Sequence, residues 1–228
     1  MAEQVQSILE QMVPHLKDLR SRSIFTSDEI TQIVNRRRQS EYLLHRVSKA
    51  YKSDYLKYIE DEIMLEKLRK LRKEKILLEM KNERRIMKQQ QQHENDDTTS
   101  VPPKQHHAYK TSGSGDSHII SHIHFLYQRT LRKFHYPLDV VLNYAQFAKH
   151  SKSFHILSRI YAEGIQHHPR EVGLWIEAAS FEYFGYVAQD YETTNDNKDD
   201  EKMIHSKVVG SSIQNARILL QRGLRINK

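Results

Sequence analysis

The sequence repeats itself at an interval of 34 residues, and this interval limits the possible folds more than any other feature. The matching pairs are Leu126 with Ile160, Tyr127 with Tyr161, Leu131 with Ile165, Val141 with Trp175 and Phe147 with Phe181. In each copy the apolar residues recur at helical spacing in two blocks, which predicts two helices per copy. A unit this short cannot bury its apolar face alone, so neighbouring units are expected to stack.

Traces of the same pattern lie on both sides of the two copies. "NARILLQRGLRIN" repeats the trailing helix of the second copy, and in "YLKYIEDE" Tyr55, Tyr58 and Glu62 align with Trp175, Ala178 and Glu182. A 34-residue pair of helices has the length of a tetratricopeptide unit. The pattern resembles the HAT (half-a-TPR) repeat, which occurs chiefly in RNA-processing complexes. This resemblance implies an α-solenoid in which the aromatic stripes pack the core and have no catalytic role. The expected repeat core is Tyr58, Leu126, Tyr127, Leu131, Tyr144, Phe147, Ile160, Tyr161, Ile165, Trp175, Phe181, Leu219 and Leu224.

The composition also predicts an all-α protein of thin helical layers. Hydrophobic residues make up 38% of the chain and charged residues 29%, with a mean hydropathy of −0.76 and only 7 Gly and 5 Pro. This balance disfavours one large spherical core. No segment has the length of a transmembrane helix or the apolar core of a signal peptide, so we expect a soluble intracellular protein. The absence of cysteine excludes disulfides and thiolate chemistry.

Two low-complexity stretches divide the sequence. We expect an amino-terminal helical region over residues 1–92, with a degenerate first HAT helix and a basic extension, and a disordered linker over 93–117. HAT repeats should follow over 118–228, interrupted by an acidic loop at about 189–202. Because the last trailing helix lacks a packing partner, further repeats are expected beyond "LRINK".

The stretch "FTSDEITQIVNRRRQSEYLLHR" predicts a helix with a clear start. Thr26 and Glu29 form a capping box, so the helix is expected to begin at Thr26. Adjacent residues on a helix diverge by about 100°, so Arg36, Arg37 and Arg38 cannot all face one phosphate backbone. Because Arg37 shares an apolar stripe, at least one of the three arginines is expected to serve packing or an ion pair.

The positive charge is concentrated in one region. The formal net charge is +7, and residues 36–88 hold 17 Lys and Arg against 9 Asp and Glu. Such a surface predicts an acidic partner, which leaves RNA, an anionic membrane and an acidic protein open. A membrane is the weakest of these because the apolar stripe lacks Trp and Phe anchors. The candidate partner- or RNA-binding residues are Arg36, Arg37, Arg38, Lys67, Arg69, Lys70, Arg72, Lys73, Arg84 and Arg85.

The segment 66–88 is the most basic part of this region and is expected to be one helix. Met64, Leu68, Leu71 and Leu78 recur on a narrow stripe with Lys75 in its gap, which predicts a seam for another helix. The remaining surface either is solvated, with its own Glu and Lys pairs, or contacts phosphates or an acidic protein. Phosphate contacts here would be salt-sensitive and would not read sequence.

Sites for catalysis or cofactors are not predicted. His118, His122 and His124 are close in sequence, but two histidines one turn apart supply only part of a coordination shell, so no metal is assigned. The sequence contains no glycine-rich phosphate loop and no Ser-His-Asp order. We therefore predict no enzyme, no cofactor and no small-molecule ligand.

Together with the repeats, two amino-terminal motifs carry a more specific resemblance. "FTSDEITQIVNRRRQSEYLLHR", "DYLKYIEDEIMLEKLRKLRKEK" and "HIHFLYQRTLRKFHYPLDVVLNYAQFAK" resemble the U3 snoRNA-associated protein 6 family. The resemblance implies a HAT-repeat subunit of the UtpB subcomplex of the small-subunit processome, acting in nucleolar 18S rRNA maturation. The implied partners are other processome proteins, including WD40-propeller subunits, and the U3 snoRNP and pre-rRNA 5′ external transcribed spacer, directly or indirectly.

Two positions depart from the repeat pattern. Val141 stands where HAT units usually carry Trp, and Glu163 where Arg is usual, so the middle repeat is degenerate.

Two other functions stay open at this stage: a HAT scaffold of a splicing or polyadenylation complex, and a direct RNA-binding protein that uses the basic helix.

Overall fold

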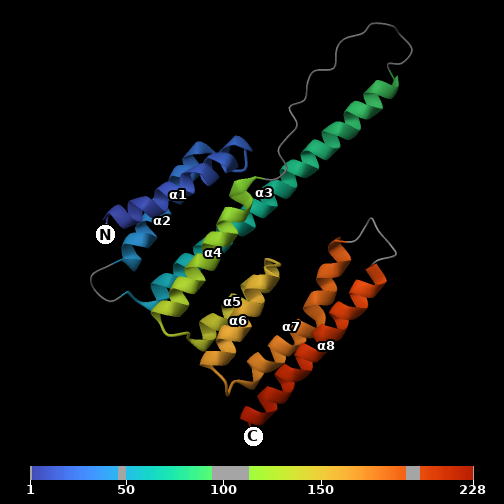
Figure 1. Ribbon diagram of the computed structural model, residues 1–228. Helices are drawn as coiled ribbons and strands as arrows, with labels where there is room; N and C mark the ends of the chain where they lie inside the picture. Colours follow the sequence, from blue (N-terminus) through green and yellow to red (C-terminus); the bar gives the residue numbers. More distant parts are fainter. Residues whose placement is uncertain (1, 46–49, 94–112, 194–200, 228) are drawn as a thin grey trace. The chain divides into compact units, whose positions relative to one another are not determined.

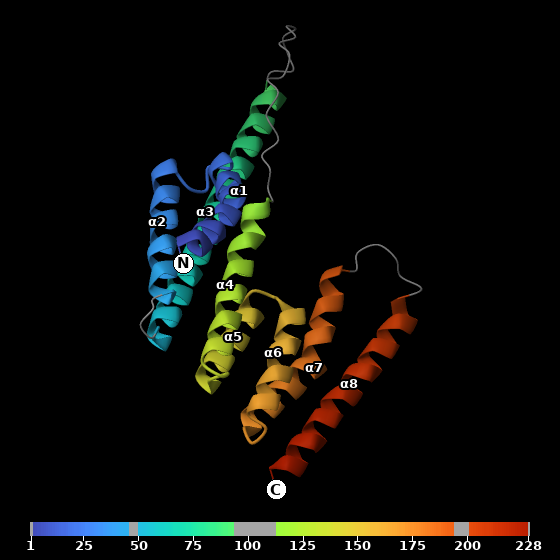
Figure 2. The same ribbon diagram turned by 60° about the vertical axis from the view of Figure 1, so that its left-hand side comes forward.

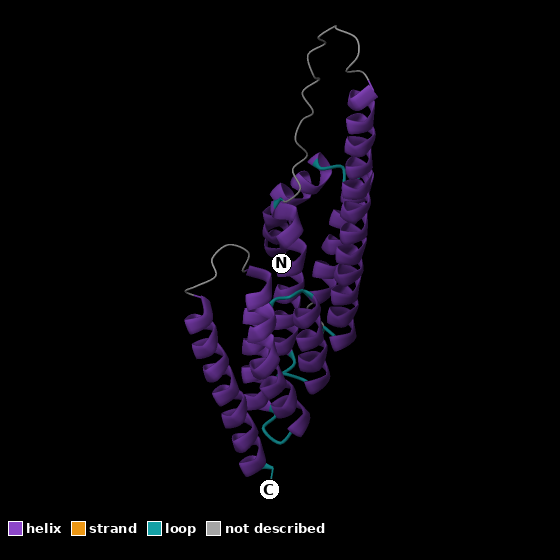
Figure 3. Cartoon of the chain, turned by 90° about the vertical axis from the view of Figure 1, so that its right-hand side faces the viewer, coloured by secondary structure: helices purple, strands orange, loops and turns teal. Residues whose placement is uncertain are grey.

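The computed structural model describes residues 2–45, 50–93, 113–193 and 201–227, and in these ranges it consists of eight helices without strands (Figure 3). This confirms the predicted all-α class and fits a solenoid of helix pairs. The chain divides into two compact units, Met1–Leu126 and Tyr127–Lys228.

The first unit contains α1 (Ala2–Ser21), α2 (Ser27–Leu44), α3 (Lys52–His93) and the beginning of α4 (Ser114–Lys133). The predicted capping box is confirmed: the Thr26 amide donates to Glu29 Oε2 at 2.9 Å, and the Glu29 amide donates to Thr26 Oγ1 at 3.3 Å. These two bonds fix the start of α2, because they satisfy amides that have no partner within the helix.

Apolar residues at helical spacing build the core of this unit. Helix α1 buries one stripe, made up of Val5, Leu9, Met12, Leu16 and Leu19. Helix α4 contributes Ile119 and Ile123, which are 1% and 0% exposed. The buried residues of helix α3 that the structure describes lie in its first half and are Tyr55, Tyr58, Ile59, Glu62, Glu66 and Arg69. Its carboxyl-terminal turns run on past the ends of α1 and α2 (Figures 1 and 2).

The second unit contains the rest of α4, then α5 (Leu138–His150), α6 (Phe154–His167), α7 (Val172–Thr193) and α8 (Glu201–Ile226). Aromatic side chains join successive helices. Tyr127 stacks on Tyr144 with ring centroids 4.6 Å apart, and Phe181 of α7 contacts the rings of both Phe154 and Tyr161 of α6. The Tyr161 hydroxyl donates to Glu177 at 3.1 Å.

Helix α6 approaches α5, and α8 approaches α7, closely at a glycine. A Cβ atom at Gly164 would lie 2.9 Å from the side chain of Val141, and one at Gly223 would lie 3.0 Å from Trp175. Val141 and Trp175 are 34 residues apart, so the same type of contact recurs in both repeats. Trp175 also donates its indole N–H to the carbonyl of Pro169 at 2.9 Å, which fixes the orientation of the ring.

Most of the predicted core positions lie inside their own units. Tyr58, Leu126, Tyr127, Leu131, Tyr144, Ile160, Tyr161 and Trp175 are buried, and Phe147, Ile165, Phe181 and Leu219 are half-buried. Leu224 is 70% exposed in the described part of the chain, and its assignment to the repeat core stays a prediction. The neighbouring Gly223 faces Trp175, and a rotation of about 100° per residue turns Leu224 away from that contact.

Described helix ends lie within the two segments that were expected to be non-helical. Helix α4 begins at Ser114, so Ser114–Ser117 are helical and not part of the linker. Helix α7 continues to Thr193 and α8 begins at Glu201, which leaves 194–200 as the part of the acidic insertion outside the described residues. Residues 189–193 and 201–202 are helical in spite of their polar composition. The insertion contains no Pro or Gly, the residues that most strongly break a helix.

Candidate partner-binding surface

Arg37, the middle arginine of the run, is a core residue of the first unit. Its side chain is 1% exposed, and its Nε and Nη2 atoms donate to the two Glu62 carboxylate oxygens at 2.7 and 2.6 Å. A third bond reaches Met12 Sδ at 3.2 Å. This pair joins α2 to α3 against α1. A guanidinium enclosed in this way cannot reach a phosphate, so the prediction that Arg37 binds a partner is wrong.

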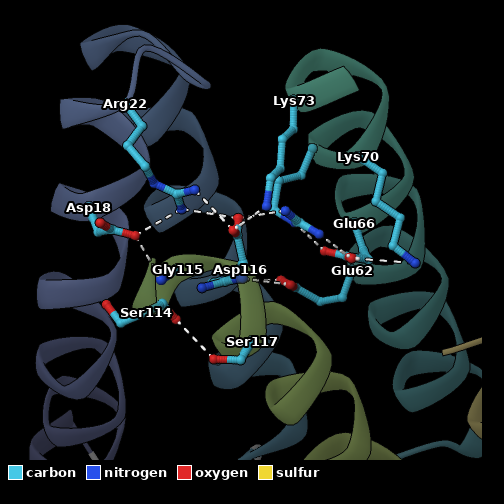
Figure 4. Close-up of polar contacts among 12 residues, drawn as sticks. Asp18, Arg22, Glu62, Glu66, Lys70, Lys73, Ser114, Gly115, Asp116 and Ser117 are labelled. Carbon is cyan, nitrogen blue, oxygen red and sulfur yellow. Dashed lines mark hydrogen bonds and ion pairs between the residues drawn. The ribbon is translucent and has the colours of Figure 1, made fainter. Parts of the chain in front are cut away.

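Asp116 gathers a second group of cations at the start of α4 (Figure 4). Its carboxylate accepts hydrogen bonds from Arg22 at 3.0 Å, from Arg69 at 2.6 Å and from Lys73 at 2.7 Å. Arg69 is also bidentate to Glu66, with both bonds at 2.7 Å, and its side chain is 5% exposed. Arg69 is therefore also withdrawn from the predicted binding surface.

The electrostatics of Asp116 follow from this crowding. Burial by itself raises the pKa of a carboxyl group, but the hydrogen bonds from Arg22 and Lys73 and the charge of Arg69 outweigh burial and lower the pKa of Asp116 to about 2. On α1, Asp18 accepts the Gly115 amide at 3.0 Å and pairs with Arg22 at 2.8 Å. The first turn of α4 is thus held to α1 and α3 by charge.

Arg72 is another predicted cation with strong internal partners. It forms two bonds of 2.6 and 2.8 Å to Glu29, donates to the Ile24 carbonyl at 3.0 Å, and lies 5.1 Å from the centre of the Phe25 ring. The hydrogen bonds from Arg72 and from the Thr26 amide lower the pKa of Glu29 to about 2. One carboxylate therefore completes the capping box of α2 and ties it to α3.

The remaining candidates are exposed. Arg36, Arg38, Lys67, Lys70, Arg84 and Arg85 all lie at the surface of the first unit. Lys70 has a long contact of 3.7 Å to Glu66 and is 48% exposed, and a contact of this kind contributes little. The basic surface available to a partner is therefore smaller than the sequence predicts, and its α3 portion is divided between residues 67–70 and 81–85.

An exposed apolar stripe follows the same helix. Met64, Leu68, Leu71 and Leu78 are 62%, 41%, 64% and 59% exposed. The predicted stripe therefore exists and faces solvent among the described residues, while the opposite face of α3 is packed into the first unit through Tyr58, Glu62, Glu66 and Arg69.

His122 and His124 are buried in the first unit, and His118 is half-buried there. His15 of α1 stacks on His118 of α4 with ring centroids 4.0 Å apart and an interplanar angle of 13°. His122 lies 3.0 Å from the Tyr58 hydroxyl through its Nε2 atom. In the described ranges no group of three or more His, Asp or Glu side chains is placed to hold a metal ion. These rings pack the contact between α1, α3 and α4.

We predict that His118 makes the stability of the first unit depend on pH. Burial, the neighbouring His15 and the charge of Arg37 lower the pKa of His118 to about 4, against the opposing effect of Glu62. The unfolded chain takes up a proton near pH 6.5 and the folded chain only near pH 4. Stability is therefore complete above pH 6.5 and falls by up to about 3 kcal/mol as the pH decreases to 4.

Urea unfolding followed by circular dichroism from pH 7.5 to 4.5 measures this slope. His118→Gln should flatten it, whereas His155→Gln, at an exposed position of the second unit, should leave it unchanged. Equal slopes in the wild type and His118→Gln would contradict the assignment.

A cavity of about 110 Å³ lies in the second unit between α6, α7 and α8. Tyr161, Ile165, Phe181 and Leu219 contribute to its walls. Pockets for small molecules usually enclose about 300 Å³ or more, so this space is better explained as imperfect packing between repeat helices.

The sequence analysis missed Asp18, Arg22 and Asp116. Arg22 follows directly after α1 and stands four residues beyond Asp18, a spacing that is a readable signal for an ion pair. Nothing local marks Asp116, because it follows a Ser- and Gly-rich stretch and its partners Arg22 and Arg69 are 94 and 47 residues away.

Comparison with known proteins agrees with the resemblance predicted from the sequence. Residues 9–101 match the family described as U3 small nucleolar RNA-associated protein 6. A curated protein of that name from Schizosaccharomyces pombe is 28% identical over 228 residues, which is 100% of this chain and 36% of the relative. A Homo sapiens homologue is 24% identical over 182 residues, 80% of this chain and 25% of the relative. The chain thus spans about a third or less of the length of these relatives.

None of the described helices is both long and apolar enough to cross a bilayer.

Proposed function

Because residues 9–101 of this chain are similar to the U3 small nucleolar RNA-associated protein 6 family, we propose that it acts in U3-dependent pre-rRNA processing as a non-catalytic scaffold. In this role it holds processome proteins, and through them U3 snoRNA and the pre-rRNA 5′ external transcribed spacer, in fixed relative positions. The proposal places the chain in the nucleolus, in 18S rRNA maturation, as a UtpB subunit beside WD40-propeller proteins. The family match is the observation that carries it.

The arrangement of charge supports a scaffold that contacts proteins over a principal RNA-binding protein. Arg37, Arg69 and Arg72 are held by carboxylates of the chain itself. The exposed cations that remain are few. Those on α3 lie beside an apolar stripe, which does not bind phosphates. The named relatives also favour U3-dependent processing over splicing or polyadenylation.

A tagged purification of the full chain from cell extract tests the proposal. U3 snoRNA should be enriched in the untreated sample, and after nuclease and a salt series a small defined set of processome proteins should stay bound. Loss of these proteins with the RNA or at modest salt would favour direct RNA binding, and recovery of splicing factors would contradict the family-based assignment.

Charge reversal separates the two binding modes. Arg36→Glu/Arg38→Glu changes only exposed side chains of α2 and should reduce RNA crosslinking without loss of the protein set. Arg69 and Arg72 are unsuitable for this purpose, because their reversal would break the ion pairs that hold the first unit together.

A further inference from the structure

The exposed apolar stripe of α3 has the spacing of a coiled-coil seam. We define the α3 seam as Met64, Leu68, Leu71 and Leu78, which are separated by four, three and seven residues. This alternation is the a/d pattern of a heptad repeat, in which the apolar residues stay on one side of a supercoiled helix. Lys75 occupies the missing position, and Asn82 and Arg85 continue the track. Isolated polar residues at such positions are known to set register and the number of strands.

The side chains of the α3 seam are apolar, but they pack little against their own unit. Its four side chains are 41–64% exposed, and Glu62, Glu66 and Arg69, which lie on the other side of the helix, are 3–5% exposed. Arg72 and Lys73 are the last residues of α3 with ion pairs to other helices in the described part of the chain. A helix that is already held in place loses little conformational entropy when a second helix packs along it.

The charges beside the seam indicate what kind of helix fits. Lys67, Lys70, Lys81 and Arg84 lie on one side of the seam, interrupted by Glu74. On the other side Glu79 lies 3.8 Å from Lys75 of the track, so its charge is paired within the helix. A second copy of this chain would bring lysine and arginine edges together, whereas Asp and Glu at the flanking positions of another helix would complement them.

We propose that the α3 seam binds an acidic amphipathic helix of another protein, which packs along residues 64–86 as a two-stranded coiled coil. Three heptads of this length extend over about 33 Å. The inference rests on the proposed scaffold function, because it expects the partner among the proteins that co-purify with the chain. It adds the surface that is used and the chemistry of the segment bound there.

Site-specific photocrosslinking in the full chain tests the proposal. Benzoylphenylalanine is placed at Leu71 in one sample and at Glu83, which is exposed on α3 but lies off the seam, in another. After nuclease treatment of the extract and irradiation, mass spectrometry identifies the linked peptides. The Leu71 sample should give one protein segment with apolar residues at heptad spacing and flanking Asp or Glu, and the Glu83 sample should not.

Variants then measure the contribution of each part of the surface. Leu71→Glu/Leu78→Glu should reduce recovery of the crosslinked partner by about ten-fold or more, and Lys67→Glu/Lys81→Glu should weaken it in a salt-dependent way. Leu71→Met/Leu78→Met is the matched control and should keep binding. Because both leucines are largely exposed, the denaturation midpoints of all three variants should stay close to the wild type.

The possible contrary results are distinct. Crosslinks from Leu71 to RNA, to a second copy, to residues of the same chain or to a segment without acidic heptads would overturn the proposal, as would the absence of any crosslink. If the wild-type chain still enriches U3 snoRNA in that case, the seam assignment alone fails. If the wild-type chain does not enrich U3 snoRNA, the proposed function fails.

Discussion

Replacing Arg37 with methionine is expected to lower the free energy of unfolding of the first unit by about 3–5 kcal/mol. The substitution removes the cation but leaves Glu62, which is 3% exposed, inside the unit. Its carboxylate would lose both charged hydrogen bonds, of 2.7 and 2.6 Å. An isolated buried charge is much less favourable than a buried pair or an apolar replacement of both partners.

Matched variants distinguish the ion pair from other effects of the substitution. Arg36→Met changes the exposed neighbour of Arg37 and should alter stability by less than about 0.5 kcal/mol. The double variant Arg37→Met/Glu62→Leu should recover most of the lost stability, because it leaves no unpaired charge. Urea unfolding followed by circular dichroism measures all three variants, and equal losses in Arg36→Met and Arg37→Met would contradict the prediction.

The single tryptophan shows where the change occurs. Trp175 lies in the second unit, is 5% exposed and contacts Gly223. Its fluorescence should therefore report unfolding of the second unit, while circular dichroism reports both units. We expect the Arg37→Met transition to shift more in circular dichroism than in tryptophan fluorescence, because the pair it breaks lies in the first unit.

Features that depend on neighbouring residues could be predicted from the sequence. The capping box of Thr26 and Glu29 needs only a three-residue spacing, and both of its bonds are present. The 34-residue interval likewise fixed which residues repeat, and Val141 and Trp175 indeed occupy equivalent contacts with glycine. Local spacing also placed Arg37 on a stripe that turned out to be buried.

Features that depend on distant partners could not be predicted. Arg37 pairs with Glu62, 25 residues away, and not with Glu41 one turn along its own helix. The start of α4 was assigned to a linker because Ser and Gly dominate it, but Asp116 gains Arg22, just past the end of α1, and Arg69 and Lys73 of α3, which no local pattern reveals. The number of charges in residues 36–88 could be read from the sequence. Which of these cations are exposed to a partner depends on the ion pairs between helices, which could not.

Asp116→Asn is expected to destabilise the first unit by about 2 kcal/mol at neutral pH. The asparagine has nearly the same shape, but it carries no charge to balance Arg22, Arg69 and Lys73. The magnitude follows from the pKa of Asp116, which is lowered from 3.8 to about 2 in the folded chain. Arg22 and Arg69 keep Asp18 and Glu66 as partners, which limits the loss.

The pH dependence gives this prediction a specific signature. A carboxyl group with a lowered pKa stabilises the folded state above pH 3.8, and that contribution is lost as the pH falls from 3.8 to 2. The difference in free energy of unfolding between wild type and Asp116→Asn should therefore be constant from pH 7 to about 5 and shrink below pH 4. The exposed Glu60→Gln variant should show no such difference at any pH. A gap that stays constant from pH 5 to 3 would mean that the loss does not come from the charge of Asp116, which would contradict the prediction.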